Sequence, residues 1–287
     1  MSNSYYGCKK LLLHTIDDYF KKVRNLGEGA FGVVYLANTQ NLAKTEIGED
    51  LPDQVAVKVM KISGAQREAM KQEITIMKHI DLPRNIKFFG CFETASQLYV
   101  IMDLAKGREL FDYINDGSMS AQQKKSVARE VAAGIKELHD IGVVHKDIKP
   151  ENIMVELLPD GKSANVRIID YGLACLVPVE GSMGRNCYGM GGTQAYKDPK
   201  QQEGNVESMK MGDWWAYGHT LYAMYTRTLL YIADEGRFIN PGWKALNKHV
   251  PEEYHDLFLT LLDVDTPQVD RPGQDEIITE IGRDYVF

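Results

Sequence analysis

The stretch VVHKDIKPENIMV, residues 143–155, places charged and amide side chains directly after a short apolar, strand-like run. Asp147, Lys149 and Asn152 lie close together in it. A carboxylate can orient an incoming hydroxyl, an ammonium can follow a migrating phosphoryl group, and an amide oxygen is a hard ligand of the kind that Mg²⁺ prefers. The stretch therefore predicts one part of a phosphoryl-transfer site.

A second carboxylate follows the next strand-like region. Residues 152–170, NIMVELLPDGKSANVRIID, read as two strands around a Pro-Asp-Gly turn, and Asp170 ends the second strand in the triplet Asp-Tyr-Gly. Alone, such a triplet is more typical of an ordinary turn after a strand. Beside Asn152, Asp170 is predicted to be the second Mg²⁺ ligand.

Upstream, residues 26–37, LGEGAFGVVYLA, contain three glycines, and each costs conformational entropy. Two explanations of the glycines are open. Side chains at this hairpin tip would hinder a phosphate chain that approaches the backbone, or the glycines serve only a tight turn. Lys58 follows in the strand-like VAVK, and Glu73 lies in residues 66–80, which have helical periodicity. Taken singly, both are typical solvated charges. In this order, Lys58 can bridge phosphate oxygens while Glu73 holds it.

Composition excludes several other classes. The chain has 287 residues, 44% apolar and 25% charged, as in ordinary soluble globular proteins. The net charge of −7 argues against nucleic acid and anionic membrane surfaces as partners. No apolar run reaches the roughly 18 residues that span a bilayer. The first residues lack both the apolar core of a signal peptide and the glycine needed for myristoylation.

The four cysteines, Cys8, Cys91, Cys175 and Cys187, are scattered without Cys-x-x-Cys spacing. Cysteines scattered in this way are typical of reduced thiols in an intracellular protein, and their scatter disfavours a disulfide framework or a zinc site. We therefore expect a cytoplasmic location, with the nucleus or a host cytosol as alternatives.

The chain changes character near residues 103–106. The part before them is strand-rich and the part after them is helix-rich, which predicts two lobes with a ligand site at their junction. Ser120 is a predicted N-cap of a helix that stops at Gly142. Residues 38–54 form a polar, acidic stretch that reads as a solvated surface loop, with partner docking as the alternative.

Taken together, these motifs resemble the eukaryotic-type serine/threonine protein kinase superfamily, from about residue 20 to residue 281. The resemblance implies an α+β fold with two lobes. Residues 20–103 would form a small N-lobe, an antiparallel sheet with one main helix, and residues 104–287 a larger helical C-lobe. The two lobes make one kinase domain, which residues 1–19 precede as an extension.

The resemblance also implies roles for residues. Asp147, Lys149, Lys58 and Glu73 would be catalytic, and Asn152 and Asp170 would bind Mg²⁺. Residues expected to contact ATP come from the glycine loop, two strands and the hinge: Gly27, Glu28, Gly29, Ala30, Phe31, Gly32, Val34, Ala56, Lys58, Met102, Asp103, Ala105 and Glu109. Met102 would be the gatekeeper, and the backbone of residues 103–105 would bond adenine. The implied spine residues are His145, Tyr171, Met77 and Phe88.

Three positions depart from the family pattern. Lys146 occupies the position of the catalytic-loop arginine, whose bidentate fork binds a phosphate on the activation loop. Because lysine lacks this fork, phosphorylation should gain less, and substantial activity without activation-loop phosphate is expected. Lys200 stands for the glutamate that pairs with the late arginine, Arg271, and would repel it unless Asp198 or another carboxylate compensates. Tyr171 stands for a phenylalanine. Asp213, in GDWWAYG, is the implied buried anchor beneath the catalytic loop. Candidate phosphoacceptors are Ser182, Tyr188 and Thr193.

The predicted function is Mg²⁺-dependent transfer of the ATP γ-phosphoryl group to serine or threonine of protein substrates. Lys149 and Thr193 occupy positions that resemble those of Ser/Thr-directed members. One alternative is a pseudokinase scaffold, which should lack one of Lys58, Asp147, Asn152 or Asp170. The other is a small-molecule kinase of the same fold, which generally lacks the Lys149 position. Neither nucleic acid nor membrane insertion is expected.

Overall fold

The chain divides into two units. The computed structural model describes residues 5–29, 32–177, 187 and 191–282. Unit 1 contains the described residues up to Asp81 together with Ile86–Ala105, and unit 2 contains Leu82–Asn85 and the residues from Lys106 onward. The short segment 82–85 belongs to unit 2 because Arg84 contacts Glu130 at 2.9 Å and Glu137 at 2.6 Å, both on helix α5.

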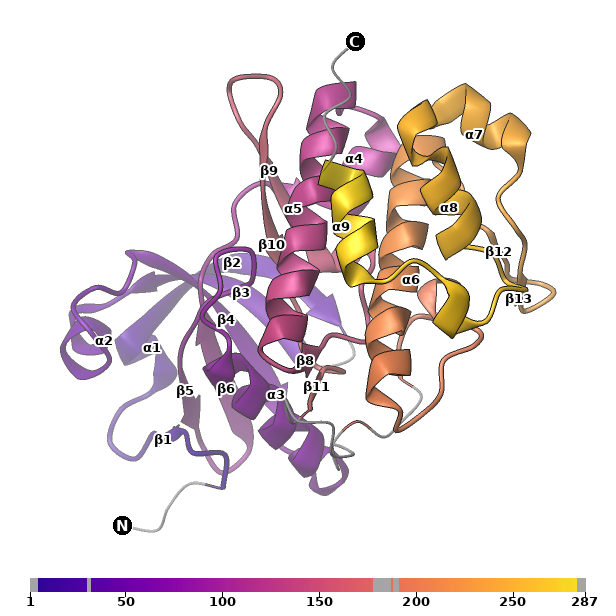
Figure 1. The fold of residues 1–287 in the computed structure, drawn as a ribbon. Helices are drawn as coiled ribbons and strands as arrows, with labels where there is room; N and C mark the ends of the chain where they lie inside the picture. Colours follow the sequence, from indigo (N-terminus) through magenta and orange to yellow (C-terminus); the bar gives the residue numbers. More distant parts are fainter. Residues whose placement is uncertain (1–4, 30–31, 178–186, 188–190, 283–287) are drawn as a thin grey trace. The chain divides into compact units, whose positions relative to one another are not determined.

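Unit 1 is built on a six-stranded sheet with the order β1-β5-β6-β4-β3-β2 (Figure 1). β1 pairs with β5 in parallel, and the other neighbours are antiparallel. The strands are β1 Lys9–Lys10, β2 Phe20–Gly29, β3 Gly32–Thr39, β4 Gln54–Lys61, β5 Phe88–Glu93 and β6 Gln97–Met102. The helices are α1 Ile16–Tyr19, α2 Asn41–Glu46 and α3 Arg67–His79, with a 3-10 turn at Gly64–Gln66 before α3.

Strand β4 is buried on both faces, because successive side chains alternate across a sheet. Val55 and Val57 join an apolar cluster with residues of α1 and α2, whereas Lys58 points to the other face, where it contacts Glu73 of α3. The prediction of a solvated loop at residues 38–54 is therefore wrong. Part of this stretch is α2, and Ala43 and Leu51 are buried in the same cluster. The few apolar residues of this stretch, Leu42, Ala43, Ile47 and Leu51, lie scattered among polar and charged ones, which gave too weak a pattern to show this.

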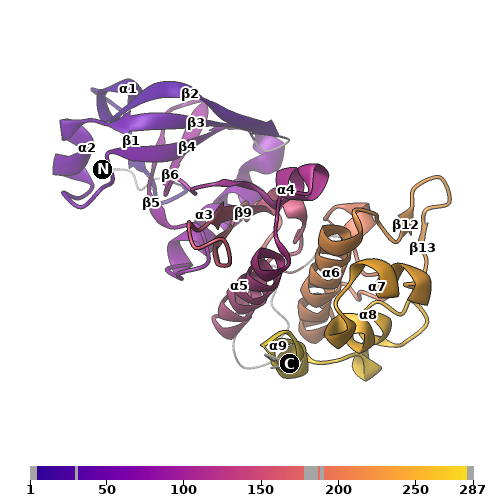
Figure 2. The same cartoon turned by 90° about the horizontal axis from the view of Figure 1, so that it is seen from above.

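Unit 2 is organised around two long helices, α5 (Ala121–Asp140) and α6 (Val206–Thr226), which lie side by side (Figure 2). The prediction for α5 is confirmed, because Ser120 caps it by accepting a hydrogen bond from Gln123 N. The remaining helices are α4 Leu110–Asp116, α7 Trp243–His249, α8 His255–Leu261 and α9 Gln274–Gly282. Short 3-10 turns lie at Pro150–Asn152, Gln194–Tyr196, Glu252–Tyr254 and Gln268–Asp270.

Small sheets complete unit 2. The predicted hairpin is confirmed: β9 (Ile153–Leu157) and β10 (Ala164–Ile168) pair antiparallel, and β7 (Arg108–Glu109) adds to β9. Two further pairs join β8 (Val143–Val144) to β11 (Cys175–Leu176), and β12 (Tyr231–Ile232) to β13 (Arg237–Phe238). The α+β class with a sheet-based first unit and a helical second unit agrees with the sequence prediction. None of the helices in the described parts of the chain has the length and apolar character of a membrane span.

Arg271 forms a buried ion pair although Lys200 occupies the position of its expected glutamate partner. Arg271 Nη1 donates to Asp198 Oδ2 at 2.8 Å, and both side chains are fully buried. The Arg271 guanidinium also lies 4.3 Å from the centre of the Trp215 ring. Lys200 is exposed. Asp198 is therefore the carboxylate that compensates for the substitution at residue 200.

We expect Asp198→Ala to lower the free energy of unfolding by about 3–5 kcal/mol, because it leaves the Arg271 charge buried without its carboxylate. Lys200→Ala, two residues away but exposed, should change it by less than about 0.5 kcal/mol. Urea unfolding of both variants beside the parent checks this. Equal losses in the two variants would mean that the buried pair contributes nothing beyond local packing.

The prediction that all four cysteines are reduced thiols is wrong. Cys8 is bonded to Cys91 and Cys175 to Cys187, across 83 and 12 residues of sequence. Disulfide pairing depends on which Cβ atoms the fold brings together, so the lack of a compact spacing motif did not exclude it. The even number of cysteines was the one signal for it. The expected cytoplasmic location loses the support of the cysteine argument and stays a prediction.

Candidate active site

Four of the unit 1 residues predicted to contact a nucleotide share one face of the sheet. Val34 is the cross-strand partner of Lys58, and Ala56, two residues earlier on β4, is the partner of Met102. Directly opposed residues point to the same side, as do residues two apart on one strand. Val34, Ala56, Lys58 and Met102 therefore form a continuous patch on the face that also carries the Lys58–Glu73 contact.

The glycine loop is a hairpin between β2 and β3, closed by the pair Gly29 and Gly32. Gly32 has φ +132°, and a Cβ there would lie 2.1 Å from the carbonyl oxygen of Val59, so only glycine fits. At Gly27 a Cβ would meet no described atom within 4 Å. A close approach within the sheet thus explains Gly32, whereas packing inside unit 1 does not require Gly27. Glu28 lies on β2 opposite Val33, and Ala30 and Phe31 lie outside the described residues.

Lys58 and Glu73 form a buried ion pair. Lys58 Nζ donates to Glu73 Oε1 at 2.6 Å, and the two side chains are only 9% and 4% exposed. The ordinary solvated-charge interpretation of either residue is therefore wrong. Burying two charges is costly unless they pair closely, so this contact fixes the position of the Lys58 ammonium on its strand.

We expect Lys58→Met to lower phosphoryl-transfer activity at least about 100-fold, since it deletes a charge that would stabilise phosphate oxygens. Glu73→Gln, which keeps a hydrogen-bond acceptor, should cost about tenfold, equivalent to about 1.4 kcal/mol. Initial rates at saturating and limiting ATP measure both. Urea unfolding must accompany them, because breaking a buried pair can itself cost about 3–5 kcal/mol. Full activity in both variants would show that the pair serves only stability.

The predicted hinge uses two of its N–H groups internally. Asp103 N donates to the carbonyl oxygen of Lys87 at 2.8 Å, and Leu104 N donates to Asp103 Oδ1 at 2.9 Å. These bonds hold the chain in position immediately after β6. An adenine bonded to this segment would therefore have to use the remaining backbone groups, among them those of Ala105.

In unit 2 the catalytic loop is anchored by Asp213 of α6, as predicted. Its carboxylate accepts hydrogen bonds from the backbone N–H groups of His145 and Lys146, each at 2.8 Å, and lies 2.9 Å from His139 Nε2. Lys146 has φ +68°, a left-handed conformation that costs free energy in a non-glycine residue. The Asp213 contacts hold the loop in this strained turn, which leads directly into Asp147.

Asp147 lies at the centre of a hydrogen-bond network. Its Oδ1 accepts from both the backbone N–H and the hydroxyl of Thr193, at 2.9 and 2.8 Å. Its Oδ2 lies 3.0 Å from Lys149 Nζ and accepts from Asn152 Nδ2 at 3.1 Å. Lys149 Nζ also donates to Thr193 Oγ1 at 2.8 Å. Three predicted site residues and one activation-segment residue are thus brought together, and the carboxylate is held in a fixed orientation.

The two predicted metal ligands lie at the same end of the β9–β10 hairpin. Ile153 is paired with Ile168, and Ile169 N donates to the carbonyl oxygen of Asn152 at 3.0 Å. The Asn152 amide is oriented by Nδ2, which donates to the backbone oxygen and the carboxylate of Asp147. Asp170 has φ +64°, a second strained position in the site. An amide oxygen and a carboxylate fit Mg²⁺, which commonly takes one or two protein ligands together with waters and phosphate oxygens.

Other residues named from the sequence support the catalytic loop. The Tyr171 hydroxyl lies within hydrogen-bond distance of Asn85 Oδ1 and the Ile168 carbonyl oxygen, at 2.9 and 3.1 Å, which explains how a tyrosine is accommodated. Its ring packs edge-on against His145, with centroids 5.3 Å apart. Asn85 gave no sequence signal, because nothing in its surroundings resembles a motif.

Burial, with the carboxylates of Asp112 and Glu151 nearby, raises the pKa of Glu109, which the sequence predicts to contact the nucleotide.

The activation segment is described only in part. Ser182 and Tyr188 lie outside the described residues. Thr193 is described, and its hydroxyl is already bound to Asp147 and Lys149. Cys187 is buried in an apolar cluster with Val144 and Met209, and its bond to Cys175 fastens it to β11.

Comparison with known proteins agrees with this geometry. The family model for the protein kinase domain matches residues 20–278. The chain belongs to the protein kinase domain family. The match begins at the first residue of β2 and ends within α9, so it includes every predicted site residue.

Individual relatives are more distant. The chain is 31% identical to a probable myosin light chain kinase of Dictyostelium discoideum over 178 residues, 62% of this chain and 52% of that protein. It is 27% identical to a second one from the same organism over 277 residues, 94% of this chain and 61% of that protein. It is 28% identical to human ribosomal protein S6 kinase alpha-3 over 216 residues, 73% of this chain and 27% of that protein. The chain thus spans less than two thirds of the length of each of these relatives.

Proposed function

We propose that this kinase domain is an active serine/threonine protein kinase that transfers the γ-phosphoryl group of ATP to protein hydroxyls. The observation that carries the proposal is the network in which Lys149 and Thr193 fix both oxygens of the Asp147 carboxylate. A carboxylate held in one orientation can align an acceptor hydroxyl and receive its proton, which are the two tasks that the protein must perform for the acceptor.

The other residues take complementary roles. In unit 1, Lys58, held by Glu73, would neutralise phosphate oxygens, and the patch formed by Val34, Ala56 and Met102 would contact the adenine and ribose. In unit 2, Asn152 and Asp170 would hold Mg²⁺, which when bound offsets negative charge on the phosphates. Lys149 would follow the moving phosphoryl group. Glu109 would contact the ribose or the substrate.

Two alternatives remain distinguishable from this function. A pseudokinase scaffold is disfavoured because Lys58, Asp147, Asn152 and Asp170 are all present, and Lys58 and Asp147 have close polar partners. A small-molecule kinase is disfavoured by Lys149 and its contact with Thr193. Three peptides identical except for Ser, Thr or Tyr at one position test the acceptor. We expect transfer to the Ser and Thr peptides, whereas transfer to Tyr alone would contradict the proposed specificity.

We further propose that the domain is active before its activation segment is phosphorylated. Burial lowers the pKa of Lys146, and its single ammonium offers no bidentate grip on a phosphate. Dephosphorylated protein, verified by intact mass, should show at least about a tenth of its maximal rate in the first turnovers, and Lys146→Arg should increase phosphate dependence. An initial rate near zero that rises with autophosphorylation would contradict this.

A further inference from the structure

A segment before the family match is fastened to the edge of the unit 1 sheet. Residues Tyr5–Leu11, here named the N-terminal clamp, include β1, which pairs in parallel with β5. Leu11 N extends this pairing by donating to the Glu93 carbonyl oxygen at 2.9 Å. Cys8 is bonded to Cys91 of β5, and both residues are buried. Covalent and backbone contacts thus join the clamp to a strand that lies within the part matched by the kinase family model.

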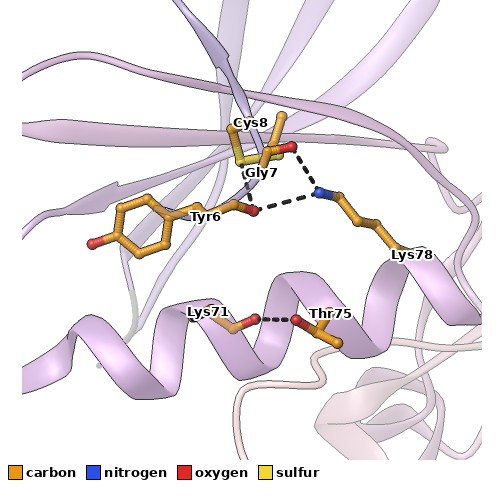
Figure 3. Close-up of a disulfide and its surroundings, with 7 residues drawn as sticks. Tyr6, Gly7, Cys8, Lys71, Thr75 and Lys78 are labelled. Carbon is orange, nitrogen blue, oxygen red and sulfur yellow. Dashed lines mark hydrogen bonds between the residues drawn. A yellow bond between two sulfur atoms is a disulfide. The ribbon is translucent and has the colours of Figure 1, made fainter. Parts of the chain in front are cut away.

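The clamp also contacts the C-terminal part of α3 (Figure 3). Lys78 Nζ donates to the carbonyl oxygens of Gly7 and Tyr6, at 2.8 and 3.4 Å. Gly7 has φ +65°, and this turn brings two successive carbonyls to one ammonium. Burial lowers the pKa of Lys78, so the carbonyl contacts partly offset the cost of removing that charge from water.

A second set of contacts lies near the beginning of α3. The Tyr5 hydroxyl donates to Glu68, and Lys71 Nζ lies 4.6 Å from the centre of the Tyr5 ring. The clamp therefore contacts α3 both before and after Glu73 in the sequence. The helix residues that make these contacts are polar, and a sequence pattern would assign them to a solvated face.

The clamp and the catalytic pair contact opposite sides of α3. Successive residues of an α-helix are rotated by about 100°. Glu68, Lys71 and Lys78 therefore lie on the side of α3 away from Glu73. Glu73, with Met70 and Met77 at helical spacing, is buried on the side that reaches Lys58. The clamp thus contacts one side of α3, and Glu73 reaches Lys58 from the opposite side.

We propose that the N-terminal clamp is a redox-sensitive positioning element, in which the Cys8–Cys91 disulfide keeps α3 where Glu73 holds Lys58. This rests on the proposed kinase function. Reduction removes the covalent tie and leaves the clamp held by non-covalent contacts, among them the β1–β5 pairing, the Lys9–Glu46 ion pair and the Lys71–Tyr5 ring contact, so that the segment opens locally more often. Without the clamp contacts, α3 would keep Glu73 paired with Lys58 in a smaller fraction of molecules. Phosphoryl transfer would fall in proportion to that fraction.

The chemical step is an ordinary thiol–disulfide exchange with a dithiol reductant. A thiolate of the reductant attacks one sulfur of the Cys8–Cys91 bond, and the other leaves as a thiolate that takes up a proton. The second thiol of the reductant then displaces the remaining cysteine. Two electrons and two protons pass to Cys8 and Cys91, and the reductant becomes a cyclic disulfide.

The test separates the two disulfides by substitution in the full chain. Cys175→Ala/Cys187→Ala leaves Cys8–Cys91 as the single reducible bond, and Cys8→Ala/Cys91→Ala leaves the other. Each protein is assayed before and after treatment with dithiothreitol, with cleavage verified by intact mass after alkylation. Hydrogen exchange of residues 67–79 is followed in the same samples. If either variant does not fold, the parent is titrated with dithiothreitol under the same two readouts, and mapping of the alkylated cysteines assigns each change to one of the two bonds.

We expect reduction of Cys8–Cys91 to raise the KM for ATP about fivefold, lower kcat about threefold and accelerate amide exchange in α3 at least tenfold. Cys8→Ala/Cys91→Ala should show these values from the start, and dithiothreitol should leave its KM unchanged. A merely structural role would reduce the amount of active enzyme, and hence kcat, without moving KM. Unchanged KM and unchanged α3 exchange after verified cleavage would overturn the proposal.

Two further variants locate the effect. Lys78→Met removes the ammonium between clamp and helix and should shift KM in the same direction. Lys44→Met, which removes an ammonium of α2 that pairs with Asp53, should not. In a Glu73→Gln background, loss of the disulfide should have no further effect, because the clamp acts through Glu73. Independent effects of the two changes would contradict that route. A lack of transfer by the oxidised parent would refute the kinase proposal, while α3 exchange would still test the clamp.

Discussion

Asp147→Asn is expected to lower kcat for phosphoryl transfer by a factor of about 10²–10⁴, the usual contribution of a positioned general base. The asparagine amide can still accept from Thr193, but its NH₂ group would face two other donors, Lys149 Nζ and Asn152 Nδ2. The variant therefore loses both the proton acceptor and the fixed orientation of its side chain. ATP affinity, measured by calorimetry, should change by less than about threefold, because the acceptor contacts matter only in the reacting geometry.

Asp160→Asn is the matched control for this variant. Asp160 carries the same charge in the same unit, but in an exposed turn where it accepts hydrogen bonds from Lys162 N and Ser163 N. The kcat of Asp160→Asn should stay within about twofold of the parent value. Parent-level turnover in Asp147→Asn would show that the carboxylate does not orient the acceptor.

Asp170→Asn is expected to abolish the Mg²⁺-dependent part of ATP binding and to lower activity by a factor of about 10³, corresponding to roughly 4 kcal/mol of lost charge stabilisation. Asparagine tolerates the left-handed backbone at this position and can still accept the hydrogen bond from Gly172 N, so the change isolates the charge. Asp170→Ala adds a backbone cost of about 1–2 kcal/mol and is the less specific variant.

Thermal unfolding with ATP, with and without Mg²⁺, measures this effect. In the parent protein Mg²⁺ should add to the stabilisation by ATP, because a ligand that binds only the folded state raises the melting temperature. In Asp170→Asn this increment should disappear while the melting temperature without ligand stays within a few degrees. An unchanged Mg²⁺ increment would place the metal site elsewhere.

Much of the candidate site could be predicted from the sequence, because its residues are local to motifs. Asp147, Lys149 and Asn152 lie within one short loop, and Asp170 follows the adjacent strand, so a hairpin alone brings the two predicted metal ligands to one end. The order of Lys58 and Glu73 along the chain predicted their pairing, although not its burial.

What could not be predicted depends on contacts between distant parts of the chain. The bond between Cys8 and Cys91 joins residues 83 positions apart and follows from the pairing of β1 with β5. Asn85 contacts Tyr171 through a polar group that belongs to no motif. The sequence names Asp198 or another carboxylate as the residue that compensates for Lys200. Only the buried contact with Arg271 shows that Asp198 is this residue. Local patterns carry no information on such spatial choices.

The central claim is that this chain transfers the γ-phosphoryl group of ATP to serine and threonine in proteins. The most direct test incubates the full chain with Mg²⁺, γ-labelled ATP and a generic protein acceptor, with Asp147→Asn in parallel, and maps the labelled residues by mass spectrometry. We predict label on serine and threonine of the acceptor, dependent on Mg²⁺ and lost in Asp147→Asn. Label confined to tyrosine or to small molecules, or equal labelling by parent and variant, would contradict the claim.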